Sequence, residues 1–163
     1  MEASVRRSPH SAGRSRPATS VSEAREARAQ IGKKFDHAVA NCSGTRLRRS
    51  DQTDLLQAAY LIVRNWRREH QSDRIEELLR RMSRGWIAPG SSLELVLLRS
   101  ALPNLDPKRA SKWAAAIELA DHAGVSKRGF ATFLKKQGGI EGAARTLARL
   151  RSAEGLLLVR DRP

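Results

Sequence analysis

The apolar residues of this chain recur mainly at helical spacing. From about residue 23 onward they fall at i, i+3, i+4 and i+7 in successive segments, and Gly or Pro residues separate these segments. The pattern predicts an all-α fold. One segment stays open, because residues 155–159 fit either a short strand or a tail that packs on the core.

Local capping signals predict where the helices begin. Ser22, Ser50 and Ser126 each precede an apolar-periodic segment and are expected to cap it. Asp106 and Pro107 predict a helix with an aspartate cap and a proline at its first position. Further helix starts are expected as capping boxes at Asp73 with Glu76 and at Ser91 with Glu94, and near Ile140.

Composition divides the chain into three parts. Residues 1–21 are rich in Ser, Arg, Pro and Ala without an apolar period, so we expect a disordered basic arm. This stretch also has the composition of a transit peptide, but it lacks the amphipathic pattern of one. Residues 22–102 are expected to form a helical bundle, in which Trp86 packs back onto the core. Residues 103–163 are expected to form a three-helix unit with a C-terminal tail.

One stretch of the third part has a distinctive pattern. Residues 119–130 end an apolar-periodic helix at Gly124, pass through a three-residue turn and begin a short basic helix. Ala120 is small enough for two helices to cross, Gly124 tolerates the positive φ of the turn, and Val125 supplies an apolar plug. Over about residues 113–135 the chain resembles the helix-turn-helix of transcriptional regulators, so the C-terminal unit is expected to be of that type.

The resemblance implies which side chains contact DNA. The exposed face of helix 126–136 is expected to enter the major groove. There Arg128 would bind guanine through two hydrogen bonds, and Thr132 would touch a thymine methyl group. The expected base contacts are Ser126, Lys127, Arg128, Thr132 and Lys135. The expected phosphate contacts are Lys108, Arg109, Lys112, Lys136, Arg145 and Arg149.

Gly129 departs from the pattern of a DNA-contacting helix. Inside a helix, Gly costs roughly 0.5–1 kcal/mol relative to Ala. The helix is therefore expected to be short or to become ordered on DNA. In the alternative interpretation, Gly129 permits close packing within a helical hairpin that does not bind DNA.

The charge distribution favours a polyanionic partner. The formal net charge is +14, and it divides into +3 over residues 1–20, +4 over 21–50, +1 over 51–90 and +6 over 91–163. The two ends of the chain therefore carry most of the positive field. Arg outnumbers Lys by 24 to 7. Arginine suits bidentate contacts to phosphate or guanine, although a codon bias towards Arg and Ala explains the ratio equally well.

Catalytic and cofactor-binding signals are lacking in the sequence. Cys42 is the only cysteine, and the four histidines do not have metal-ligand spacing. Gly138 and Gly139 lack the lysine that follows in a phosphate-binding loop. We therefore expect no enzymatic activity, cofactor, metal or small-molecule substrate. No apolar run is long enough to span a membrane, and a cytoplasmic, nucleoid-associated protein is expected.

These observations favour a non-enzymatic protein that binds duplex DNA, such as a small transcriptional regulator or an accessory factor of a mobile element. A homodimer formed through residues 51–90 would suit paired half-sites. Two alternatives remain open. One is a helical adaptor or inhibitor that binds an acidic protein partner. The other is an RNA-binding protein, against which the scarcity of aromatic residues argues.

Overall fold

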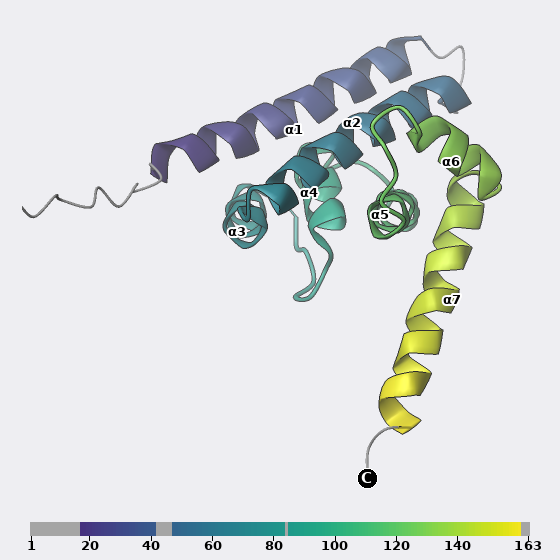
Figure 1. The fold of residues 1–163 in the computed structure, drawn as a ribbon. Helices are drawn as coiled ribbons and strands as arrows, with labels where there is room; N and C mark the ends of the chain where they lie inside the picture. The colour runs from purple at the N-terminus through teal and green to yellow at the C-terminus, as the bar shows by residue number, and fades with distance from the viewer. Residues whose placement is uncertain (1–16, 42–46, 84, 161–163) are drawn as a thin grey trace, which may run out of the picture.

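The computed structural model describes residues 17–41, 47–83 and 85–160, and within these ranges it contains helices and turns but no strand. The all-α prediction is therefore confirmed for the described part of the chain. The helices are α1 (Pro17–Ala40), α2 (Arg49–Arg68), α3 (Ser72–Met82), α4 (Leu93–Ala101), α5 (Pro107–His122), α6 (Phe130–Lys136) and α7 (Gly139–Arg160) (Figure 1).

The helices share one hydrophobic core. The long helices α1 and α2 run alongside each other, and α3, α4 and α5 lie under them (Figure 1). Helix α7 packs against α5 and α6, and its C-terminal part extends beyond the other helices. Buried apolar side chains of α2, α4 and α5 meet at the centre, and Leu102, in the segment that joins α4 to α5, is buried as well. The predicted bundle and the C-terminal unit are therefore continuous through their packing.

Both ends of the helical region differ from the prediction. Helix α1 begins at Pro17, before the expected start at Ser22, so the last residues of the predicted 1–21 arm are helical. Proline has the φ angle of a first helical residue, which favours this earlier start. Residues 1–16 of the arm lie outside the described residues. At the other end, residues 155–159 do not form a strand, because α7 continues as a helix to Arg160.

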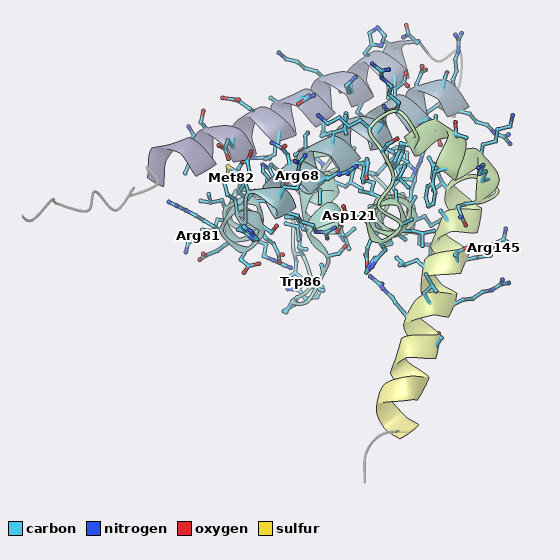
Figure 2. All side chains as sticks on the ribbon, in the orientation of Figure 1. Arg68, Arg81, Met82, Trp86, Asp121 and Arg145 are labelled. Atoms are coloured by element: carbon cyan, nitrogen blue, oxygen red, sulfur yellow. The ribbon has the colours of Figure 1, made fainter. Side chains whose placement is uncertain are left out.

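Several local predictions are wrong. Neither predicted capping box forms a side-chain cap. Glu76 instead accepts hydrogen bonds from Arg80 one helical turn later, and Glu94 is fully buried. Trp86 does not pack on the core but is 77 % exposed in the loop between α3 and α4 (Figure 2). The predicted cap of α5 is confirmed, since the Asp106 carboxylate accepts from the Arg109 N–H at 2.8 Å.

Candidate nucleic-acid interface

A tight turn joins α5 to α6 and sets the direction of the short helix. Gly124 has a φ of +59°, which confirms the predicted left-handed turn residue. The N–H of Val125 bonds to the carbonyl of Ala120 at 3.0 Å, and the N–H of Gly124 bonds to that of Asp121 at 2.9 Å. This pair of bonds is the Schellman arrangement that ends a helix at glycine. Helix α5 therefore stops where the sequence predicts.

Helix α6 begins later than predicted. Its first residue is Phe130, and Ser126 does not cap it, so the expected helix 126–136 is corrected to Phe130–Lys136. The preceding residues form a turn in which the Gly129 N–H bonds to the Ser126 carbonyl at 3.0 Å. Side chains of α2 bind two carbonyls of this turn, those of Val125 and Lys127.

Three side chains of α2 hold this turn. The amide of Gln57 donates to the Lys127 carbonyl at 2.9 Å. The Tyr60 hydroxyl and the Arg64 guanidinium both donate to the Val125 carbonyl. Burial raises the pKa of the Tyr60 phenol, with Arg64 opposing the rise, so the hydroxyl stays protonated and available as a donor. The position of α6 thus depends on α2 as well as on α5.

Helix α6 has one buried face and one exposed, basic face. Phe130 is fully buried and its ring stacks on that of Tyr60 with centroids 5.2 Å apart. Leu134 is buried beside it. The residues expected to contact bases all lie on the exposed surface, together with one expected phosphate contact: Ser126, Lys127, Arg128, Thr132, Lys135 and Lys136.

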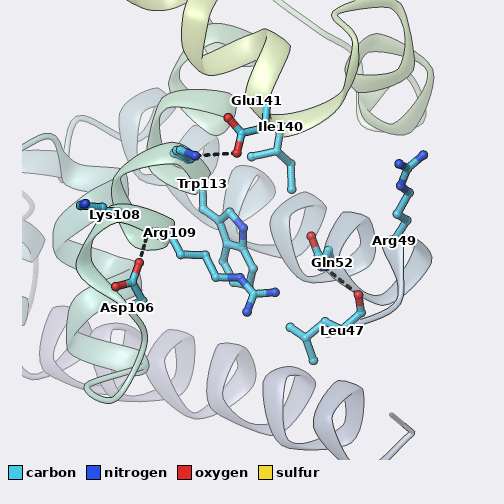
Figure 3. Close-up of a pocket in the computed structure, with 10 residues that line it drawn as sticks. Leu47, Arg49, Gln52, Asp106, Lys108, Arg109, Trp113, Ile140 and Glu141 are labelled. Carbon is cyan, nitrogen blue, oxygen red and sulfur yellow. Dashed lines mark hydrogen bonds and ion pairs between the residues drawn. The ribbon is translucent and has the colours of Figure 1, made fainter. Parts of the chain in front are cut away.

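The other end of α5 borders a basic groove. We use this name for the cavity of about 610 Å³ lined by Leu47, Arg49, Gln52, Asp106, Lys108, Arg109, Lys112, Trp113, Ile140 and Glu141. It brings together three of the expected phosphate contacts, Lys108, Arg109 and Lys112. Figure 3 shows α5 on one side of the groove and Arg49 of α2 on the other.

Aromatic and ionic contacts orient two of these cations. The guanidinium of Arg109 lies over the Trp113 ring at 4.9 Å from its centre, a cation–π distance. The Lys112 ammonium pairs with the Glu141 carboxylate of α7 at 2.5 Å, and both side chains are largely exposed. Lys108 lies at the outer rim of the groove and points away from Trp113 (Figure 3).

The last two expected phosphate contacts lie along α7. Arg145 and Arg149 follow Glu141 at intervals of one helical turn, so they occupy neighbouring positions on one side of the helix. Both are exposed, and Arg145 projects from the side of α7 that faces away from α5 (Figure 2). Neither side chain lines the basic groove.

Two charged residues of the groove, Arg49 and Glu141, were not predicted as part of a site. Arg49 belongs to a basic run at the start of α2, but no sequence signal places this run beside α5, because the approach depends on the packing of α2 against α5. Glu141 opens α7 and has the spacing of an ordinary first-turn acidic residue. Its pairing with Lys112 spans the α5–α7 contact and was not predictable from local pattern.

A second charged cluster lies near the C-terminal end of α5. The Arg67 guanidinium of α2 lies 2.7 Å from the carboxylate of the fully buried Glu94 and also pairs with Asp121. Arg151 of α7 lies 2.6 and 2.7 Å from the two carboxylate oxygens of Glu118. Burial raises the pKa of Glu94, and Arg67 offsets part of that rise. These ion pairs join α2, α4, α5 and α7.

Comparison with known proteins gives no match: no protein-family model, curated protein or solved structure matches the chain. Among the described residues, no three His, Cys, Asp or Glu side chains are placed to hold a metal ion. No helix in the described ranges has the length and apolar character needed to cross a membrane. The candidate interface is therefore defined by its own geometry and charge.

Proposed function

We propose that this protein is a non-enzymatic duplex-DNA-binding protein that inserts the exposed face of α6 into the major groove. One observation carries the proposal: α6 buries Phe130 and Leu134 and leaves its cationic and hydroxyl side chains exposed. A helix with this division can rest on its own domain and present polar groups to base edges. The turn held by α2 provides the fixed orientation that such a contact requires.

The residues divide by role. Arg128 is proposed to donate two hydrogen bonds to guanine, and Thr132 to contact a thymine methyl group. Because both Lys127 and Arg128 precede the first residue of α6, they would enter the groove from the turn. The cations of α5 and α7 would bind phosphate and set the register without reading sequence. Such a protein would act on the nucleoid as a small regulator or as an accessory factor of a mobile element, and a homodimer would bind paired half-sites.

Binding to selected duplexes tests the proposal. Duplexes are enriched from a random-sequence pool, and their affinity is compared with that of scrambled duplexes by fluorescence anisotropy. Lys127→Ala/Arg128→Ala should lose about 1–3 kcal/mol of discrimination per base contact removed while keeping weak binding. The matched control is Arg25→Ala/Arg74→Ala, which removes two exposed cations from α1 and α3 and should keep full discrimination.

Three outcomes would contradict the proposal. The first is the absence of duplex binding even at low salt, where phosphate contacts are strongest. The second is equal discrimination by the α6 variant and its control. The third is preferential binding of single-stranded RNA in direct competition, which would instead support the RNA-binding alternative.

A further inference from the structure

The basic groove combines features that suit a chain of phosphates. It is open along its length, it is lined by four cations from two helices, and it lies beside the element proposed to enter the major groove. We propose that the basic groove binds the phosphate backbone of the duplex that α6 contacts, and that Glu141 competes with this phosphate for Lys112. This inference rests on the proposed function and adds to it Arg49, Glu141 and a mode of regulation.

Unpaired positive charge predominates in the groove. Arg49, Lys108 and Arg109 have no ion-pair partner among the residues that the structure describes. Only two carboxylates line the groove, and both are already engaged. Asp106 caps α5, and Glu141 pairs with Lys112. An added anion would therefore meet cations whose charge is not neutralised within the described protein.

Arg109 is positioned by an aromatic contact. Its guanidinium lies over the Trp113 ring, while its N–H groups make no bond to a carboxylate in the described structure. Phosphate oxygens accept from these N–H donors in a bidentate manner. Because Arg109 is already oriented in the free protein, binding would lose less side-chain entropy than it would at a freely rotating arginine.

The fold places the groove next to α6. The amide of Gln57 bonds to the Lys127 carbonyl, and Gln52, five residues earlier on α2, lines the groove. Five helical residues rise about 7.5 Å. The last residues of α6 lead through Gly138 and Gly139 to Ile140 in the groove wall. The turn before α6 and the groove are therefore neighbouring surfaces.

Glu141 occupies a position that a phosphate oxygen would take beside Lys112. Its carboxylate lies 2.5 Å from the Lys112 ammonium, which is where a phosphate oxygen would bind this lysine. Both side chains are largely exposed, so their ion pair contributes little to stability and exchanges readily. Glu141 thus holds Lys112 in the free protein and must release it when a phosphate enters the groove.

The salt dependence of binding measures these phosphate contacts. A fluorescent duplex of about two helical turns is titrated with the full chain between about 50 and 200 mM NaCl, and log K is plotted against log salt concentration. The slope of this plot is negative, and below we use the word slope for its magnitude. Each lost contact lowers this magnitude by about 0.9. Arg49→Gln/Arg109→Gln should lower the slope by about 1.8 and weaken binding roughly tenfold or more. Arg49→Gln alone changes only an exposed side chain and should lower the slope by about half as much.

Glu141→Gln tests the competition. Freeing Lys112 should raise the slope by about 0.9 and tighten binding severalfold, with no change in sequence discrimination. The control Arg25→Gln/Arg74→Gln removes the same charge as the groove pair from α1 and α3 and should leave the slope close to the wild-type value. Thermal unfolding of each variant verifies that the fold is retained.

The possible failures are separable. If the groove variants match their control while Lys127→Ala/Arg128→Ala still loses discrimination, the groove inference is overturned and the proposed function stands. If the α6 variant matches its control while the groove variants lose slope, the role of α6 fails, and only phosphate-backbone binding by the groove is retained. An unchanged slope for Glu141→Gln overturns the competition. Inorganic phosphate that binds the wild-type groove at millimolar concentration and constant ionic strength, but not the groove variants, and leaves duplex binding unchanged would identify a free-phosphate site and overturn the backbone assignment.

Discussion

The two ends of α5 use positive charge in different ways. At the C-terminal end, Asp121 binds Arg67 and Glu118 binds Arg151, so these arginines join helices. The cavity there, of about 440 Å³, is lined by more carboxylates than cations. At the N-terminal end, the basic groove has the opposite balance, and Arg109 contacts an aromatic ring instead of a carboxylate.

This difference separates structural arginines from candidate binding residues. In a chain of net charge +14, a count of basic residues cannot indicate which of them contact a partner. Arginines that are engaged by internal carboxylates have their field locally cancelled, whereas cations without such partners project it into solvent. By this criterion Arg67 belongs to the scaffold, and Arg49 and Arg109 belong to the proposed interface.

The largest effect is expected where α7 begins, next to the groove. A Cβ atom at Gly142 would lie 1.7 Å from the carbonyl oxygen of Gln137, far inside contact distance. Gly142→Ala must therefore displace the α6–α7 connection, together with Ile140 and Glu141 of the groove wall. We expect a loss of more than about 3 kcal/mol in the free energy of unfolding, measured by urea denaturation.

The control for this change is Gly85→Ala, because a Cβ atom there meets no atom within 4 Å. Its effect should stay within about 0.5–1 kcal/mol. Equal stability of the two variants would show that the α6–α7 connection adapts easily. In that case the groove wall would not be the fixed surface described above.

The comparison itself is tested by the same substitution at two arginines of α2. Arg67→Met leaves the fully buried Glu94 carboxylate without its partner, which should cost about 3–5 kcal/mol. Arg49→Met removes an exposed cation and should change stability by no more than about 0.5 kcal/mol. Chemical denaturation of both variants supplies the measurement. Similar losses at the two sites would remove the distinction between scaffold and interface arginines.

The sequence predicts those features of the fold that depend on short-range pattern. The apolar stripe of α5 and the aspartate cap at Asp106 are confirmed, as is the left-handed Gly124. Each of these depends on residues within a few positions of one another, so the local chemistry suffices. The aromatic residue Phe130 is buried on the inner face of α6.

Features that depend on tertiary partners were not predictable in this way. Glu94 has the position of a capping-box residue, but it is buried in the core, where it forms an ion pair with Arg67 of another helix. Ser126 has the chemistry of a cap, but it lies in a turn that side chains of α2 hold, and α6 begins only at Phe130. Trp86 is exposed although its size favours burial. The α2 wall of the groove follows the same rule, since Arg49 reaches α5 only through packing.

The smallest expected effect is a pH dependence at the carboxylate-rich end of α5. Burial raises the pKa of Glu94 above its ordinary value of 4.5. The folded protein therefore retains this proton to higher pH than the unfolded chain, so the free energy of unfolding contributed by Glu94 falls as pH rises from 4.5 towards the raised pKa. Glu94→Gln should remove this fall, whereas Glu141→Gln, at the exposed carboxylate of the groove, should retain it. Urea unfolding across this pH range distinguishes the two variants. If Glu94→Gln kept the pH dependence of the wild type, the Glu94 carboxyl would not be the group that retains the proton. The two ends of α5 would then be more alike than their charges indicate.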